Sequence, residues 1–158
     1  EPLENNRNKA LRGFNNLDTA KLLVPAAFDI SNPQILPLIR SRNENYLVTA
    51  RQWPAFLYPH GHIYNPADID EGLGYGYLLL RVMKHIFTTP SSALEGPGAK
   101  GKGGNAKLIG MTAVTPEAVA YTAVQTRYVL NSQSEWGIID NDFNAETFFW
   151  NVVNAFKG

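Results

Sequence analysis

Residues 70–87, DEGLGYGYLLLRVMKHIF, are the longest apolar stretch of the sequence. At about 100° per residue, apolar side chains would lie on nearly every side of a helix formed by this stretch, which is typical of a buried helix. The exception is a narrow polar stripe in which Arg81 and His85 are spaced i, i+4 and therefore share one face. Asp70 is a candidate N-cap, and Pro90 follows the stretch. We therefore expect a central helix over residues 70–87.

Two later segments predict helices that pack on the central one. Residues 115–131 open with threonine, proline and glutamate, the order that helix starts favour. In residues 145–156, apolar side chains recur with helical spacing. Either Asp142 or Asn144 can cap this last helix, which should close the core.

Shorter elements are expected earlier in the chain. Asn32 is followed by a proline, as at a helix start, and predicts a short helix there. Thr49 and Gln52 have the spacing of a capping box, which predicts a second short helix that stops before Pro59. Residues 22–25 are too short for a helix and are expected to lie extended against the core. The candidate strands are residues 46–49 and 108–111.

The predicted fold is mainly α, a single compact helical domain of about five helices with long loops and at most a small β element. The chain has 158 residues, 44% of them hydrophobic, which is enough for the core of one domain. Residues 1–20 are Asn-rich and poorly periodic, so we expect a partly ordered N-terminal arm followed by one helical domain over residues 21–158.

The sequence contains no cysteine, which excludes disulfides, thiolate catalysis and Cys-ligated zinc. We find neither an apolar stretch long enough to span a membrane nor a signal peptide, and we expect no membrane partner. The expected location is intracellular, in the nucleus or the cytoplasm. The oligomeric state stays open.

The formal net charge is zero, but the charges are unevenly distributed. Residues 81–127 carry about +4, whereas acidic residues dominate the end of the chain. Residues 96–107 form a Gly-rich, Lys-bearing segment that can either bind an anion or serve as a solvated connection. The candidate anion-binding residues are Arg81, Lys84, His85, Lys100, Lys102, Lys107 and Arg127.

Arg127 falls within the apolar arc of its predicted helix, between two alanines. A buried guanidinium needs a partner. It can pair with a carboxylate from the acidic segment 140–146, or it can bind the anion of a ligand. The sequence leaves both alternatives open.

The spacing of His60 and His62 directs both imidazoles to one side of an extended segment. Asp68 or Asp70 could complete a set of two histidines and a carboxylate, which suits zinc or non-haem iron. Plain solvent-exposed histidines are the alternative. We expect no cofactor other than this divalent metal.

Separated motifs resemble an uncharacterised domain family found mainly in mushroom-forming fungi. They are QWP and FLY within residues 52–58, KHIFT and PSS within residues 84–92, and GNA, GM and VTP within residues 104–116. The resemblance covers nearly the whole chain and implies no established activity. Families of this kind are expanded in their genomes, which suggests a link to mobile elements or genome conflict. The chain departs from the family pattern at residues 60–62, so the resemblance does not support a shared metal site there.

Three functions follow from these observations. The first is a non-enzymatic module that binds nucleic acid or another phosphate-bearing polyanion through the basic residues, and we prefer it. The second is a small metal-dependent hydrolase or nuclease that uses His60 and His62. The third is a protein-interaction module that uses the acidic end of the chain. Whether the chain is an enzyme is not decided by the sequence.

Overall fold

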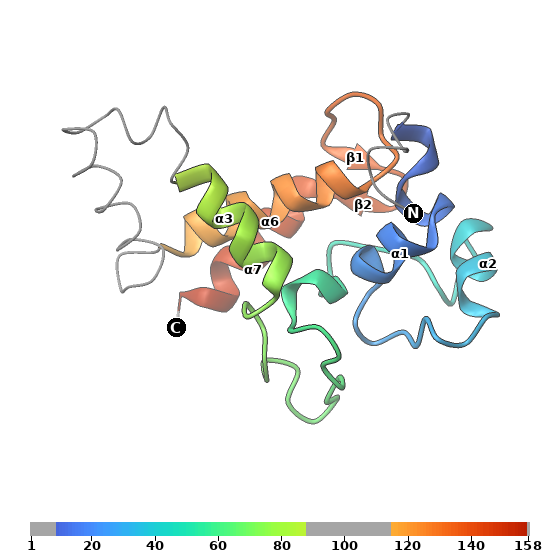
Figure 1. Cartoon of the computed structure of the whole chain (residues 1–158), viewed down its shortest axis with the longest axis horizontal. Coiled ribbons are helices and arrows are strands. Elements are labelled where there is room, and N and C mark those ends of the chain that lie inside the picture. The colour runs from blue at the N-terminus through green and yellow to red at the C-terminus, as the bar shows by residue number, and fades with distance from the viewer. Residues whose placement is uncertain (1–8, 88–114, 158) are drawn as a thin grey trace.

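The computed structural model describes residues 9–87 and 115–157, where helices dominate (Figure 1). Among these residues are the α-helices α1 (Leu17–Leu23), α2 (Ile35–Arg40), α3 (Tyr77–Phe87), α6 (Pro116–Leu130) and α7 (Ala145–Phe156). Shorter elements are the 3₁₀ turns η2 (Lys9–Leu11), η3 (Gly13–Asn15) and η4 (Ala55–Leu57) and the strands β1 (Ile139–Asp140) and β2 (Phe143–Asn144). The predicted fold class, one mainly helical domain with long loops and a small β element, is confirmed.

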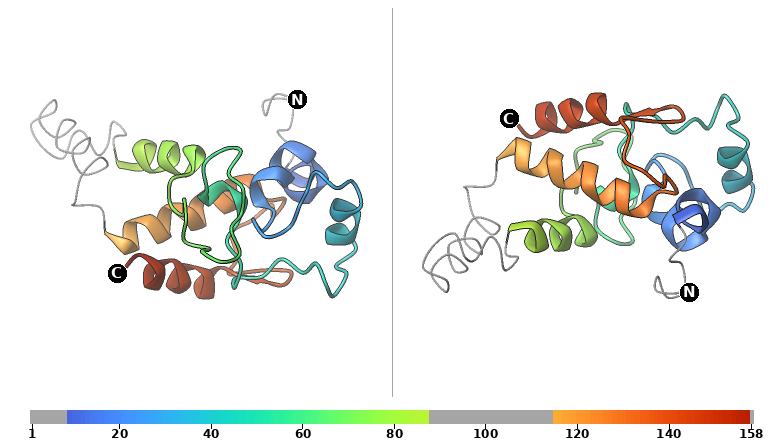
Figure 2. Two further views of the ribbon diagram at one scale, coloured as in Figure 1. Left: turned by 90° about the horizontal axis from the view of Figure 1, so that it is seen from below. Right: turned by 90° about the horizontal axis from the view of Figure 1, so that it is seen from above.

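Helices α3, α6 and α7 pack together, and α6 lies between the other two (Figure 2). The prediction that the helix of residues 70–87 is the central one is wrong, because α6 contacts both α3 and α7. Side-chain size gives the reason, because Ala120 and Ala123 of α6 are fully buried and let neighbouring helices approach its backbone closely. Leu79 of α3 and Phe148 of α7 are also fully buried in this core.

Helix α6 begins and ends where the sequence predicts. The Thr115 hydroxyl accepts a hydrogen bond from the Ala118 N–H at 3.0 Å, and a proline occupies the first helical position. The buried hydroxyls of Thr122 and Thr126 each donate to the carbonyl four residues earlier, at 2.8 Å. Both polar groups are therefore satisfied inside the core.

Helix α3 begins later than predicted, at Tyr77, because the preceding glycines fold the chain over η4. Gly74 has a φ of 89°, a left-handed conformation that favours glycine. The N–H groups of Gly74 and Gly76 both donate to the Leu57 carbonyl, at 2.8 and 3.1 Å. A Cβ on Gly76 would lie only 1.9 Å from the Phe56 carbonyl oxygen. A continuous helix over these residues would lose both the turn and the close contact.

The Thr49 and Gln52 pair forms half of a capping box, but around a turn rather than a helix. The Thr49 N–H donates to the Gln52 side-chain oxygen at 2.8 Å. Pro54 follows, and a proline disfavours the α conformation in the residue before it, so only the η4 turn forms. The predicted strand at residues 46–49 is absent. The other candidate strand, residues 108–111, lies outside the described residues.

Helix α1 was not predicted, and residues 22 and 23, expected to be extended, belong to it. Asn16 caps this helix by accepting hydrogen bonds from the N–H groups of Asp18 and Thr19. The helix ends before Pro25, which cannot continue it. Part of the expected N-terminal arm, residues 9–20, thus lies in two 3₁₀ turns and the first half of α1.

The segment before α1 contacts the C-terminal end of α6. The Lys9 ammonium donates to the Tyr128 carbonyl, and Arg12 donates to the Val129 carbonyl at 3.1 Å. Burial lowers the pKa of Lys9, and the neighbouring Arg12 lowers it further, against the opposing effect of Asp140. Cations placed here satisfy carbonyls that lack a partner within the helix and complement its dipole.

The hairpin of β1 and β2 leads directly into α7. Asn144, one of the two predicted caps, accepts a hydrogen bond from the Thr147 N–H at 3.0 Å. The other candidate, Asp142, instead forms an ion pair with Arg42 at 2.8 Å. The hydrogen bond from Arg42 lowers the pKa of Asp142.

Candidate functional site

Helix α3 presents a cationic face. Tyr77, Arg81, Lys84 and His85 are exposed on the side of α3 opposite to buried Leu79. We call these four exposed residues the α3 face. The Arg81 Nη1 donates to the Tyr77 hydroxyl at 3.1 Å, and the guanidinium lies 5.5 Å from the tyrosine ring centroid. The helix contains no aspartate or glutamate, so its own sequence does not neutralise the face.

A groove of about 870 Å³ lies beside this face. Its walls come from α1 and the loop after it, from η4, from residues 59–62 and from the first turn of α3. The lining is mainly apolar and includes Leu22, Phe28 and Leu78. Tyr77 also lines the groove, so the groove and the α3 face form one continuous surface. The volume lies in the range typical of ligand sites.

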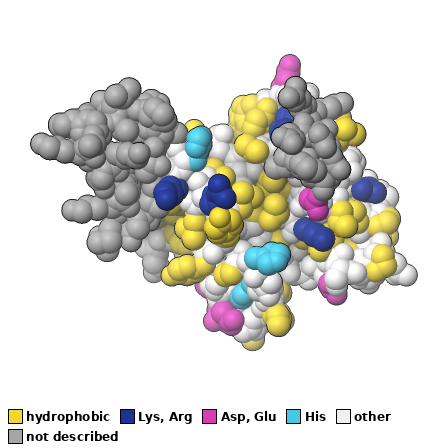
Figure 3. Space-filling view, viewed as in Figure 1, with side chains coloured by type: hydrophobic (Ala, Val, Ile, Leu, Met, Phe, Trp, Pro, Cys, Tyr) yellow, Lys and Arg dark blue, Asp and Glu magenta, His cyan; other side chains and the backbone are white. Residues whose placement is uncertain are grey.

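The space-filling view shows this surface from the side of Figure 1 (Figure 3). Lysine and arginine side chains lie over α3, and hydrophobic side chains extend from there toward α1. Lys21 and Asp18, from α1, line the groove on its far side. The surface therefore combines cations with apolar area, as a ligand with both anionic and planar apolar groups requires.

His60 and His62 both line the groove, but in different environments. The His62 ring stacks on Tyr58, with centroids 4.9 Å apart and planes inclined by 8°. On Gly72, a Cβ would lie 3.0 Å from the His62 ring, so this packing needs glycine. The His62 Nε2 is buried and has no hydrogen-bond partner within the described part of the chain. His60 is exposed.

The two aspartates predicted to complete a metal site, Asp68 and Asp70, are exposed in the loop that follows. Across residues 9–87 and 115–157, no three histidine, aspartate or glutamate side chains gather as a metal ion would need. The structure thus does not assemble the predicted set of two histidines and a carboxylate.

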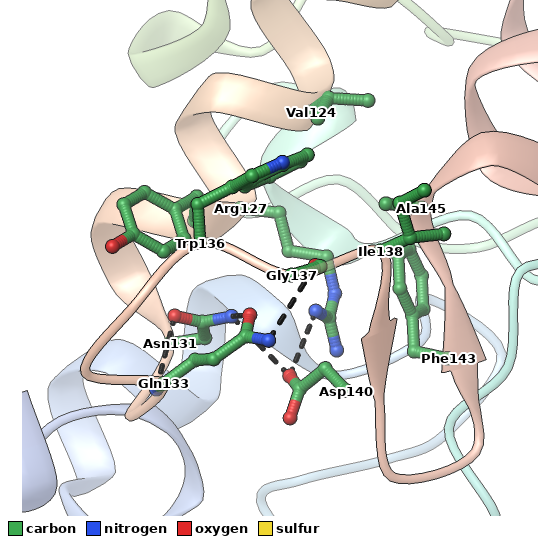
Figure 4. A pocket seen from close by; sticks show the side chains of 11 residues that line it. Val124, Arg127, Asn131, Gln133, Trp136, Gly137, Ile138, Asp140, Phe143 and Ala145 are labelled. Atoms are coloured by element: carbon green, nitrogen blue, oxygen red, sulfur yellow. Dashed lines mark hydrogen bonds and ion pairs between the residues drawn. The ribbon is translucent and has the colours of Figure 1, made fainter.

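Arg127 is buried in the last turn of α6, where the close-up shows its guanidinium directed at Asp140 (Figure 4). The side chain is 7% exposed, and its Nη1 lies 2.9 Å from the Asp140 carboxylate. Asn131 donates to the same carboxylate oxygen at 3.2 Å, and the guanidinium carbon lies 3.5 Å from the Phe143 ring centroid. Of the two alternatives that the sequence left open, the structure has the internal pair. Cavities of about 10 and 70 Å³ adjoin Arg127, below the size of typical ligand sites.

The structure thus brings Arg81, Lys84 and His85 together and leaves Arg127 apart from them. The other candidate cations, Lys100, Lys102 and Lys107, lie outside the described residues, as does the Gly-rich segment 96–107. Sequence reasoning missed the groove, because most of its walls are loops that have no periodic pattern. Asn16 followed by Asp18 is a helix-start signal that could have located α1, one of those walls.

A family model described as a family of unknown function, DUF6698, matches residues 1–158. The chain belongs to this family. No curated protein and no solved structure matches the chain. Within the described residues, no helix has the length and apolar character needed to cross a membrane.

Proposed function

We propose that this member of the family is a non-enzymatic module that binds nucleic acid through the α3 face. The observation that carries the proposal is the position of Arg81, Lys84 and His85, exposed together on a helix without acidic residues, beside an open groove. Cations on one surface displace counterions from a phosphate backbone, which supplies affinity for any nucleic-acid sequence.

Two alternatives from the sequence receive less support. A metal-dependent hydrolase needs convergent ligands, and the described histidines and aspartates do not converge. A protein-interaction module that uses the acidic end of the chain has fewer carboxylates available than the sequence suggests, because Asp140 and Asp142 are engaged by arginines, while Glu135 and Glu146 are exposed. The α3 face is therefore the best supported binding surface.

Binding to a fluorescently labelled oligonucleotide should fall steeply as the salt concentration rises. The double variant Arg81→Gln/Lys84→Gln should bind more weakly. The plot of log affinity against log salt should become shallower by about 0.7–0.9 for each phosphate that the variant no longer neutralises. Fluorescence anisotropy in a series of salt concentrations measures both quantities.

Arg51→Gln is the matched control, because Arg51 is exposed but belongs neither to α3 nor to the groove. It should leave the affinity and the salt dependence close to those of the wild type. Equal affinities for the double variant and the wild type, with circular dichroism showing both folded, would contradict the proposal.

The proposal extends to the setting of the protein. We propose that it acts in the nucleus or the cytoplasm and that its family is the fungal one described from the sequence motifs, linked to mobile elements or genome conflict. Fractionation of cells that express a tagged chain tests the location.

A further inference from the structure

Tyr77 belongs to two surfaces. Its hydroxyl accepts a hydrogen bond from Arg81 on the α3 face, and its side chain, 66% exposed, also lines the groove. A phosphate held by Arg81 would therefore lie next to the groove mouth. A group attached to that phosphate can reach the groove directly.

The groove suits a flat apolar group better than a second phosphate. Its lining is mainly apolar, and planar side chains contribute to it at Phe28, His60 and Tyr77. Aromatic side chains of this kind stack on nucleobases, and every base has the required flat face.

The charges on the groove wall indicate how a bound nucleic-acid strand would be oriented. Asp18 and Asp29 lie on the wall formed by α1 and the loop after it, together with one cation, Lys21. The Asp29 carboxylate also accepts hydrogen bonds from the N–H and hydroxyl of Ser31. Phosphates are repelled from carboxylates, so the backbone of a strand should stay on the α3 side and its base should point toward α1.

We propose that the groove receives an unstacked base of single-stranded nucleic acid, so that the protein prefers single strands to duplexes. This inference rests on the proposed function, because the α3 face supplies the phosphate contact. In a duplex the bases are stacked and paired, and only their edges are accessible. Taking a base out of the stack costs free energy in a duplex and little in a single strand.

The test compares three DNA probes of one length, about 12 nucleotides, a length within the range of site sizes of known single-strand binders. They are a mixed-sequence single strand, the duplex of that strand, and a strand of abasic residues that keeps every phosphate. At fixed low salt, the single strand should bind at least about fivefold more tightly than the abasic strand, because stacking of one base on an aromatic side chain has that magnitude. The duplex should also bind more weakly than the single strand.

Two variants identify the groove as the site of the base. Tyr77→Leu and His60→Ala remove exposed planar groups and should lower the affinity for the single strand toward that for the abasic strand. His60→Ala should leave the salt dependence unchanged, since it keeps every residue of the α3 face, whereas Tyr77→Leu also removes the hydroxyl to which Arg81 donates. Tyr121→Leu is the matched control, because Tyr121 is a half-exposed tyrosine of α6 that does not line the groove.

The outcomes separate this inference from the proposed function. If all three probes bind equally and both variants behave as the wild type, the base lies outside the groove and the inference is overturned, while the α3 face stands. If none of the probes binds, both proposals fail. If the abasic strand binds but the two groove variants weaken it as much as the single strand, the groove holds backbone rather than base, which also overturns the inference.

Discussion

Arg127 illustrates how one buried charge is accommodated. Loss of hydration lowers its pKa, while the charge of Asp140 and their hydrogen bond act in the opposite direction. The face of the Phe143 ring provides a further favourable contact for the cation. The Arg127 Nε has no hydrogen-bond partner in the described part of the chain. The attraction of the guanidinium to Asp140 and to the Phe143 ring must therefore offset the cost of burying this group.

Replacing Arg127 by methionine should destabilise the protein by about 3–5 kcal/mol, because it leaves a partly buried Asp140 carboxylate without its cation. Adding Asp140→Asn to this variant should cost less than the sum of the two single changes. Urea denaturation gives the free energy of unfolding of the wild type, the two single variants and the double variant. Arg42→Met, which breaks the exposed pair with Asp142, is the control and should have a much smaller effect. Additive costs in the cycle would show that Arg127 and Asp140 are not coupled.

Tyr58 should make the stability decrease at alkaline pH. Burial raises its pKa from 10.0 to about 12, and its hydroxyl donates to the Ile69 carbonyl at 2.7 Å. Because the pKa is higher in the folded state, the stabilisation is complete below pH 10 and is lost as the pH rises toward 12.

Between pH 10 and 12, ionisation of Tyr58 should lower the free energy of unfolding by at most about 3 kcal/mol. The variant Tyr58→Phe should be less stable at pH 8 and should lose less further stability between pH 10 and 12. Denaturant midpoints at each pH give the comparison, and parallel curves for the two proteins would refute this assignment.

Gly76 decides how α3 meets η4. Gly76→Ala should destabilise the protein by about 3 kcal/mol or more, because the new Cβ would overlap a backbone oxygen rather than a movable side chain. Gly61→Ala is the control, since Gly61 has a φ of 78° with open space around it, and the conformational cost alone is about 1 kcal/mol. Thermal melts compare the melting temperatures of the two variants with that of the wild type. A similar loss in the two variants would indicate that the contact with η4 is not limiting.

The elements predicted correctly are those whose signals are local. The start of α6 needs only its own first residues, and α7 needs only its spacing and Asn144. The start of α3 could not be predicted in this way. Position 76 requires glycine because the Phe56 carbonyl lies against it. This contact joins residues that are distant in the sequence, so the residues next to Gly76 do not predict it.

The same distinction applies to the candidate site. Arg81 and His85 were found together because helical spacing puts them on one face. The groove depends on how loops far apart in the sequence come together, which no periodicity records. The predicted ligand set of two histidines and a carboxylate does not gather among the described residues, where His62 stacks on Tyr58 and the two aspartates are exposed in the loop that follows.

The fold places acidic and basic side chains in different parts of the molecule. The net charge is zero, yet Asp140 and Asp142 are paired at the end of α6 remote from the C-terminal half of α3 (Figure 1). These two carboxylates therefore neutralise Arg127 and Arg42 rather than the α3 face. A neutral protein can in this way keep a cationic surface for a ligand.

The contacts between the ends of the chain bear on how fast it folds. Lys9 bonds a carbonyl 119 residues away, and Arg42 pairs with a carboxylate 100 residues away. Loops of this length must close before these bonds can form, and the entropy of closure opposes them. Helical bundles fold in microseconds to milliseconds because their contacts are local, whereas folds with distant contacts take milliseconds to seconds. The contacts between distant residues should make this chain fold more slowly than a helical bundle with only local contacts. The docking of its N-terminal segment on α6 should be among the last events of folding.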